Sequence, residues 1–319
     1  MVKEAHTVGA LAQSSRRMVQ TIGVEGKVTA TGRIAMDPHI IVATDFSPRS
    51  DRALRRAIIL AKQTEAALSL VHIVDNDQPQ YLVDAQMAAA RPLLEETARA
   101  IDQIDGISAQ ATLASGDVFS GILGAAEELG ASLIVLGPHR RQLRDAFIGT
   151  TAERTIAHSR VPVLMAAGVP SGPHGRALVA LDMDEASKAA GKLVRELAIL
   201  QKVEILAMHA FDAPAQGMMK RALSEPEAVD HYVASEERRA DQQLQDMLND
   251  IGMHAARRVL QPISGKVAPT ILATASRENA ALVVVGTNQR TGLRRFLLGS
   301  VAEEVLADSE ADVLVIPQG

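Results

Sequence analysis

Two stretches of the chain carry residues whose types and spacing suit the binding of an anion. The clearer one is Ala281–Asp308, ALVVVGTNQRTGLRRFLLGSVAEEVLAD, which contains Gly286, Arg290 and the pair Gly299–Ser300. It reads as a buried strand, a glycine, a basic loop, and then a glycine and a hydroxyl that open a helix. This order predicts free backbone N–H groups and a helix N-terminus at the carboxyl end of a strand, where open α/β sheets hold phosphates.

The second stretch, Ala131–Ser159, is ASLIVLGPHRRQLRDAFIGTTAERTIAHS. It repeats the same plan with Gly137, Arg140 and the pair Gly149–Thr150. The sequence therefore indicates two copies of one unit that carries a phosphate site. We expect each unit to place its last helix at the same kind of site.

The same residues also have a purely structural interpretation. Ser300-Val-Ala-Glu303 and Thr150-Thr-Ala-Glu153 both have the spacing of a capping box, which explains the hydroxyl and the acid without any ligand. Arg290, together with its neighbouring arginines, suits phosphate contact but is equally typical of a solvated basic loop. Capping and phosphate binding are compatible, because a phosphate would use the remaining N–H groups.

The elements that must position these residues alternate between strand and helix. The first strand ends at Asp45, and Ser47 before Pro48 suits an N-cap followed by proline at the first helical position. Alternation without long hairpins predicts a doubly wound parallel sheet. The predicted strands are Ile40–Thr44, Leu68–Val74, Ser108–Leu113, Leu133–Leu136, Val161–Met165, Ala177–Leu181, Val203–Ala207, Arg257–Leu260, Val283–Val285 and Val313–Ile316.

The repeat has a constant register in three blocks, with insertions confined to connections. The offset between equivalent residues is 137 in the first block, 149 in the second and 150 in the third. The equivalent pairs are Asp45 and Asp182, His72 and His209, Gly137 and Gly286, and Gly149 and Gly299. Two domains are therefore expected, half 1 at 37–168 and half 2 at 176–319. A linker at 169–175 joins them, and an arm at 1–36 is expected to hold a short helix near Leu11–Thr21.

Composition excludes several classes of function. The chain has 319 residues, 47% of them hydrophobic, and a net charge of −5, so a general polyanion-binding surface is not expected. Seven aromatic residues argue against stacking platforms for nucleic acid, and the lack of cysteine removes disulfides and thiolate metal sites. No apolar run is long enough for a membrane helix. A cytoplasmic protein without nucleic-acid or membrane partners is the expectation.

IIVATDFSPRSDRALRRAI with LVHIVD, and VVVGTNQRTGLRRFLLGSVAEEVL, resemble the opening and closing signatures of the universal stress protein family. The resemblance covers about 39–167 and 176–318 and indicates a tandem member. It implies two five-stranded parallel sheets of the adenine nucleotide alpha hydrolase-like fold and a cytoplasmic stress-response role. It also implies a pseudo-twofold axis where the last strands of the halves pair, which makes an intramolecular pseudo-dimer and leaves a homodimer open.

One branch of that family binds ATP through Gly, two residues, Gly, nine residues, then Gly with Ser or Thr. Half 2 fits except at the middle glycine, which is Gln289. Half 1 has Arg140 at that position and only eight residues before Gly149. A long side chain there either fills the phosphate space that glycine leaves open or, as a guanidinium, clamps the phosphate. The cofactor implied is ATP or another adenine nucleotide, with Mg²⁺ as an optional companion.

Four further residues are assigned through the resemblance. Asp45 and Asp182 match the family acid near the adenine and ribose, and a carboxylate can accept hydrogen bonds from ribose hydroxyls or the adenine amino group. The alternative is an aspartate that caps the strand-to-helix turn. Ile73 and Ala210 match a small apolar residue that contacts the base through its backbone.

Three classes of function stay open on these residues. The first is a stress or signalling protein that responds to an adenine nucleotide in at least one half. The second is an interaction protein with degenerate phosphate loops, and the third is a slow ATPase. No catalytic residue and no metal ligand is identified, since no recognised nucleophile motif or ligand spacing is present. His72 and His209 recur at one repeat position, which favours a structural role.

Overall fold

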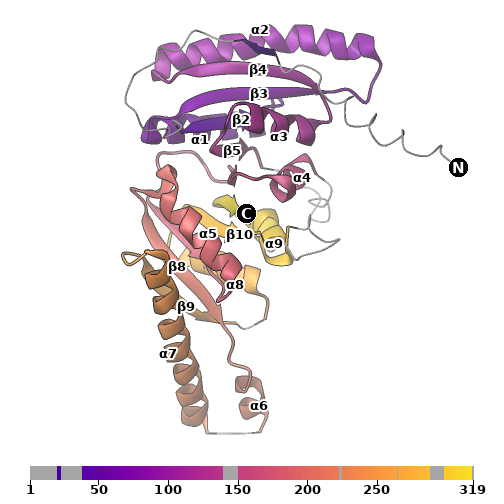
Figure 1. The fold of residues 1–319 in the computed structure, drawn as a ribbon. Helices are drawn as coiled ribbons and strands as arrows, with labels where there is room; N and C mark the ends of the chain where they lie inside the picture. The colour runs from indigo at the N-terminus through magenta and orange to yellow at the C-terminus, as the bar shows by residue number, and fades with distance from the viewer. Residues whose placement is uncertain are drawn as a thin grey trace, which may run out of the picture.

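The computed structural model describes residues 20–22, 38–138, 150–222, 225–263, 265–287 and 298–317. Within these ranges the two halves have the same succession of elements, and Figure 1 shows half 1 above half 2 with their strands running into one sheet. Every strand predicted from the sequence is present; β5 (Leu133–Leu136) has the predicted bounds, and the ends of the others agree to within four residues.

Half 1 contributes five strands and four helices. Helix α1 begins as predicted, because the Ser47 hydroxyl accepts a hydrogen bond from Ser50 N and Pro48 is the first helical residue. It ends at Glu65, which adopts the left-handed conformation. The elements are β2 (His39–Ala43), α1 (Pro48–Thr64), β3 (Ala67–Asp75), α2 (Gln80–Asp105), β4 (Ala109–Gly116), α3 (Val118–Glu128), β5 (Leu133–Leu136), α4 (Thr151–His158) and β6 (Val163–Met165).

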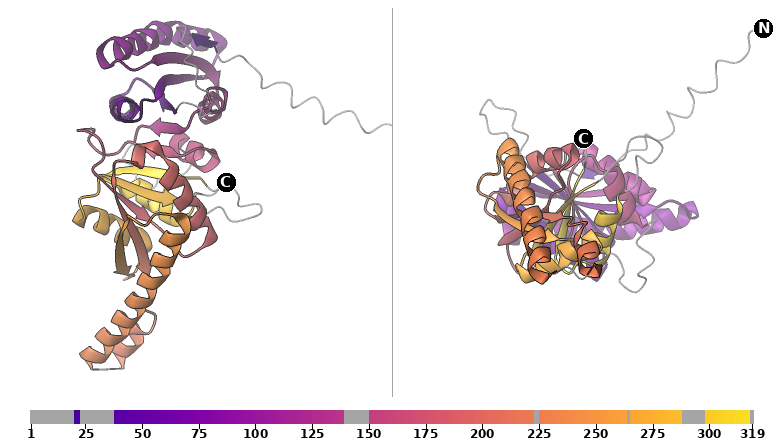
Figure 2. Two further views of the ribbon diagram at one scale, coloured as in Figure 1. Left: turned by 60° about the vertical axis from the view of Figure 1, so that its left-hand side comes forward. Right: turned by 90° about the horizontal axis from the view of Figure 1, so that it is seen from below.

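Half 2 repeats this order with two additions, the 3₁₀ helix η1 (Ala198–Leu200) and the helix α6 (Gln216–Arg221). Its elements are β7 (Arg176–Ala180), α5 (Glu185–Glu196), η1, β8 (Glu204–Phe211), α6, α7 (Pro226–Ile251), β9 (Arg257–Pro262), α8 (Val267–Arg277), β10 (Leu282–Gly286), α9 (Ser300–Asp308) and β11 (Asp312–Ile316). Because α2 and α7 both have 26 residues, most of the extra length of half 2 lies in the connection that contains α6. This part projects beyond the sheet (Figure 2).

The strands form one sheet in the order β1-β4-β3-β2-β5-β6-β11-β10-β7-β8-β9. Strands within each half are parallel, whereas β6 and β11 pair antiparallel, with Leu164 opposite Leu314. These two leucines lie 150 residues apart, so they occupy the same position in the repeat and mark the pseudo-twofold axis. The predicted pairing of the last strands is thus confirmed, and it joins the two five-stranded sheets edge to edge.

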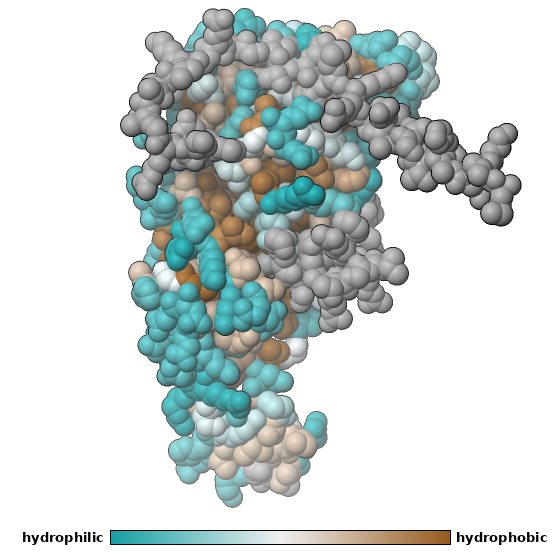
Figure 3. Space-filling model, viewed as in Figure 1, coloured by the Kyte–Doolittle hydropathy of each residue, from teal (hydrophilic) through white to brown (hydrophobic). Residues whose placement is uncertain are grey.

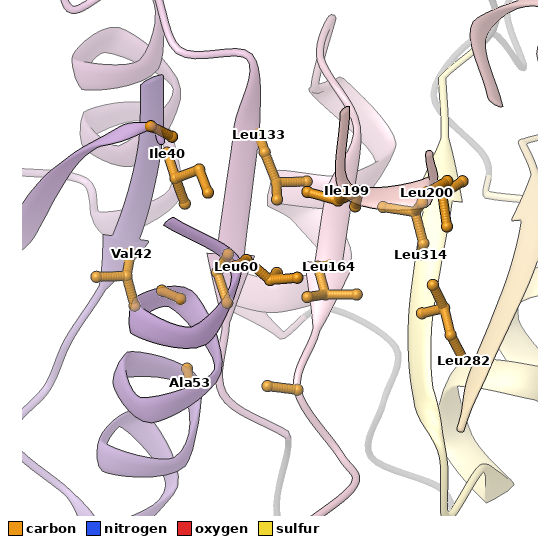
Figure 4. Packing of buried hydrophobic residues seen from close by; sticks show 14 of the residues in the cluster. Ile40, Val42, Ala53, Leu60, Leu133, Leu164, Ile199, Leu200, Leu282 and Leu314 are labelled. Atoms are coloured by element: carbon orange, nitrogen blue, oxygen red, sulfur yellow. The ribbon is translucent and has the colours of Figure 1, made fainter. Parts of the chain in front are cut away.

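Helices cover both faces of the sheet, and each face has its own apolar core. One core contains Leu60 of α1 and Leu244 of α7, and the other contains Ile156 of α4 and Val305 of α9. Both cores extend across the seam between halves, as Figure 4 shows for the first, in which Leu164 lies between half 1 residues and the half 2 residues of η1 and β11. Burial of each such aliphatic side chain stabilises the fold by about 1.5–3 kcal/mol.

The surface agrees with this arrangement. On the face shown in Figure 3, hydrophobic residues gather around the middle of the molecule, where the halves meet, while the outer side of α7 is hydrophilic. None of the helices in the described ranges combines the length and the apolar character that a membrane crossing requires.

The N-terminal arm departs from expectation where it can be compared. The sequence predicts a helix near Leu11–Thr21, but Gln20–Ile22 forms strand β1 and pairs antiparallel with β4, Thr21 opposite Thr112. A short isolated helix is marginal in water, whereas the outer side of β4 offers unpaired backbone groups to an extended segment. The prediction is therefore wrong at residues 20 and 21, and its remainder lies outside the described residues.

Candidate functional site

The strand order places a topological switch point at the same position in each half. In half 1, β2 has β3 on one side and β5 on the other, and in half 2, β7 lies between β8 and β10 in the same way. Strand order reverses at these two points, and such switch points are where open α/β sheets bind ligands. Asp45 follows β2 and Gly137 follows β5, so both lie at the carboxyl edge of neighbouring parallel strands.

Half 2 brings the equivalent residues together by the same topology. Asp182 follows β7 and Gly286 ends β10, and these strands are parallel neighbours. Helix α9 connects the parallel strands β10 and β11, so it must begin at the carboxyl edge of the sheet. The site predicted from the sequence therefore has an acid, a glycine and a helix N-terminus at one edge.

Asp45 is held by its own turn. Its Oδ1 accepts a hydrogen bond from Ser47 N at 3.0 Å, and Arg49 lies 3.7 Å from its Oδ2. Partial burial works to raise the pKa of Asp45, but hydrogen bonds from Ser47 and Ser50 and the charge of Arg49 outweigh it, so this pKa is lowered. The contact with Ser47 is the turn-capping role that the sequence left open, and the carboxylate is ionised at neutral pH.

Asp182 has a simpler environment. Its Oδ1 accepts from Met183 N at 2.8 Å, and its own N–H donates to the Ser187 hydroxyl at 2.9 Å. The N-cap of α5 is Asp184, so Asp182 does not cap that helix. Its exposed carboxylate keeps acceptor capacity for a ligand.

The two repeat histidines tie the first two strands of each half together. His72 Nδ1 lies 2.7 Å from Thr44 O, and His209 Nδ1 lies 3.0 Å from Leu181 O. The carbonyls belong to the residues just before Asp45 and Asp182. The structural role predicted for these histidines is confirmed, and it fixes the loops on which the two acids lie.

The residues assigned to the base differ between the halves. Ile73 is buried and fills the space beside Gly121 so closely that a Cβ there would lie 2.9 Å from the Ile73 side chain. In half 2 the equivalent residue is Ala210, which is smaller and partly exposed. Residue 210 of half 2 therefore carries a smaller side chain than residue 73 of half 1.

The glycine at the end of β5 is also more tightly packed than the glycine at the end of β10. A Cβ on Gly137 would lie 2.8 Å from the backbone oxygen of Arg49, so β5 abuts the start of α1. A Cβ on Gly286 would lie 3.7 Å from the Ala190 Cβ, which is an ordinary contact. In half 1 the glycine is required by the packing of the fold itself, whereas in half 2 the packing leaves room.

The helix starts also differ, and one capping prediction is wrong. In half 1 the Thr150 hydroxyl accepts from Glu153 N at 3.1 Å, as the capping box predicts. In half 2 the N-cap is Gly299, with φ at 92°, and Ser300 is the first helical residue without a side-chain capping bond. Glycine reaches this positive φ at no steric cost, and it moves the cap one position before the hydroxyl.

Several predicted site residues lie outside the described part of the chain. They are Gly149, Arg140, Arg290 and Gln289. Their contribution to either site stays a prediction. In the described residues, no group of three or more histidine and acid side chains is arranged to hold a metal ion.

One electrostatic interaction between acidic residues was missed by the sequence interpretation. Glu153 and Glu303 are equivalent residues on α4 and α9, and they lie close enough across the pseudo-twofold axis to interact. Burial and the charge of Glu153 raise the pKa of Glu303 above its ordinary value. The signal was available in the repeat register, because equivalent residues of the last helices meet near such an axis.

Comparison with known proteins gives the same tandem organisation. The model of the "Universal stress protein family" matches residues 36–167 and 174–317. A universal stress protein of Mycolicibacterium smegmatis is 25% identical over 302 residues, which cover 88% of this chain and 98% of that protein. Universal stress protein A of Photorhabdus laumondii is 34% identical over 109 residues, covering 32% of this chain and 76% of that protein.

Solved structures agree on the fold. The crystal structure of a universal stress protein from Archaeoglobus fulgidus superposes with a TM-score of 0.67 at 22% identity, covering 89% of this chain and all of the other. At this identity the likeness speaks for the fold of both halves.

Proposed function

Because the chain belongs to the universal stress protein family, we propose that it is a stress-response or signalling protein that binds an adenine nucleotide, and that half 2 is the binding half. The observation that carries this proposal is the start of α9. There Gly299 forms the cap and the Ser300 hydroxyl has no capping bond, beside a strand-end glycine that is not crowded.

The chemistry of this site suits a nucleotide phosphate. The first N–H groups of a helix have no partner within the helix, so those of Ser300, Val301 and Ala302 can donate to phosphate oxygens. The helix dipole adds to the attraction. The Ser300 hydroxyl supplies one more donor, and a Mg²⁺ ion, where present, would be held mainly by the phosphates.

The nucleoside end of the ligand would contact Asp182 and the position assigned to the adenine base, Ala210. The Asp182 carboxylate can accept hydrogen bonds from ribose hydroxyls, since an ionised carboxylate only accepts. The small side chain of Ala210 leaves the backbone of β8 accessible to a base. Gly286 would then lie between these two contacts and the phosphate end, as the strand order requires.

We propose that half 1 serves the fold rather than the ligand. Its hydroxyl caps α4, its glycine is packed on Arg49 O, and Ile73 fills the base position. These features of half 1 are what favours the second candidate function, an interaction protein without nucleotide. We assign no catalytic reaction to either half and place the protein in the cytoplasm, with 37–168 and 176–319 as its domain limits.

The test is ATP binding by the full chain, measured by calorimetry with and without Mg²⁺. Ser300→Asp puts a negative charge at a helix start, which favours the helix but repels a phosphate. We expect a loss of affinity of about tenfold or more, equal to about 1.4 kcal/mol. Thr150→Asp is the matched control, because aspartate also caps well, and it should leave affinity unchanged.

Two outcomes would count against the proposal. A parent protein that binds no adenine nucleotide would favour the interaction function. A loss confined to Thr150→Asp would place the ligand in half 1. Phosphate release that follows the protein through purification and disappears in Ser300→Asp would instead revive the slow ATPase.

A further inference from the structure

The pairing of β6 with β11 does not by itself select a partner. Leu164 faces Leu314 at equivalent repeat positions, and Val163 faces Val315. Two copies of half 1, or two copies of half 2, would offer the same backbone register and similarly apolar side chains. Another feature must therefore decide that half 1 pairs with half 2.

A buried polar cluster lies beside this seam. Arg56 of α1 places its Nε 2.6 Å from Asp312 Oδ2 at the start of β11, and His174 of the linker places its Nε2 2.8 Å from the same oxygen. The three side chains are 4%, 0% and 1% exposed. One guanidinium and one carboxylate, from different halves, thus balance their charges out of contact with water.

The linker completes the cluster through its backbone. Arg56 NH1 donates to Gly172 O at 2.6 Å, and Gly168 N donates to Asp312 Oδ1 at 2.8 Å. Both oxygens of the carboxylate are therefore engaged. His174 lies in the linker just before half 2, which carries Asp312, so Arg56 is the side chain that half 1 contributes.

The cluster occurs once, although the fold is repeated. The repeat register puts Leu193 at the position of Arg56 and Pro162 at the position of Asp312. In a pair of two half 1 copies, each Arg56 would face a proline. In a pair of two half 2 copies, each Asp312 would face a leucine.

We propose that the Arg56–Asp312 pair selects the partner of the β6 and β11 edges, so that half 1 accepts half 2 and rejects a second copy of itself. A buried ion left without its partner disfavours an assembly by roughly 100- to 1,000-fold in the equilibrium constant. Each like-with-like pair would contain two such ions. This is selection against wrong partners by uncompensated buried charge.

The test begins with the folded full chain carrying a protease site after Ser171, an exposed linker residue. The protein is cut, mixed with an ¹⁵N-labelled copy and held in urea below the unfolding transition until label exchange is complete. Native mass spectrometry then counts the three kinds of pair. We expect half 1–half 2 pairs to exceed the statistical share of about one half and to exceed each like pair by roughly 10,000-fold or more, because each like pair contains two unpaired ions.

The matched variant is Arg56→Leu with Asp312→Ala, which removes both charges and leaves no buried ion unpaired. It should bring the mixture close to the statistical one-to-two-to-one ratio. A statistical mixture from the parent, dissociation of the parent into single halves, or an unchanged bias in the double variant would each overturn the proposal.

A second measurement uses the intact chain, so that it does not depend on the halves staying folded after the cut. Arg56→Leu and Asp312→Ala alone should each raise the unfolding equilibrium constant by roughly 100-fold or more. The double variant should raise it by clearly less than the product of the two single effects. Independent effects would mean that the two charges are not partners, and the proposal would fail.

Discussion

The two helix starts that the sequence makes equivalent should respond differently to loss of a hydroxyl. Thr150→Ala removes an acceptor that binds Glu153 N at 3.1 Å, with Thr150 in the extended conformation of an N-cap. Loss of such a cap costs about 1 kcal/mol. Ser300→Ala removes a hydroxyl that makes no capping bond, at the first position of α9. Alanine is a better helix former there, so the expected cost is about zero.

The assay is urea unfolding of both variants beside the parent, without nucleotide. With a slope of about 3 kcal/mol per molar, a loss of 1 kcal/mol lowers the midpoint by about 0.3 M. Thr150→Ala should show this shift, and Ser300→Ala should coincide with the parent. ATP affinity should change in the opposite pattern, falling for Ser300→Ala and not for Thr150→Ala.

Equal losses of stability in the two variants would refute the reasoning. They would mean that Ser300 caps its helix as Thr150 does, so that its hydroxyl is engaged without any ligand. A Ser300→Ala protein with full stability and full affinity would refute only the assignment of the hydroxyl to the phosphate. The two results are separable because one is measured without ligand.

Three further outcomes are expected. Gly137→Ala should lower the free energy of unfolding in urea by about 1–3 kcal/mol, because its Cβ would lie 2.8 Å from a backbone oxygen. Gly286→Ala should be near neutral, and equal effects of the two substitutions would contradict the difference in packing. Glu303 has a raised pKa, so its ionisation opposes folding as pH rises through that pKa. The Glu303→Gln variant should therefore be more stable than the parent at pH 7, by about 0.5 kcal/mol for a partly exposed group, and this gain should vanish near pH 4, where Glu303 of the parent is protonated. Asp45 has a lowered pKa, so its contribution to stability is lost as pH falls through that pKa. Carboxyl NMR should find the Asp45 titration below the ordinary range for aspartate, and Arg49→Gln should move the titration to higher pH. A titration that does not move in this variant would exclude Arg49 as a cause.

Much of the fold could be predicted from the sequence because local residue patterns and the internal repeat specify it. The Ser47–Pro48 start of α1 and the Thr150 cap depend on residues three positions apart, which the chain itself brings together. The constant offsets between halves predicted that the second half would repeat the first. The resemblance to the family then predicted that the last strands pair, and the structure confirms this with Leu164 opposite Leu314.

Tertiary structure decided what depends on residues far apart or on small differences in backbone. Arg56 meets Gly172 O across 116 positions and His174 meets Asp312 across 138, and no periodicity connects such partners. The positive φ of Gly299 places the cap of α9 one residue before the hydroxyl, a backbone conformation that the capping-box spacing does not reveal. The sequence by itself determined the repeated fold and the edge of the sheet that carries the candidate site residues, because these follow from local propensity and register. The difference between the two candidate sites came from the tertiary structure, because it depends on how closely one backbone approaches another.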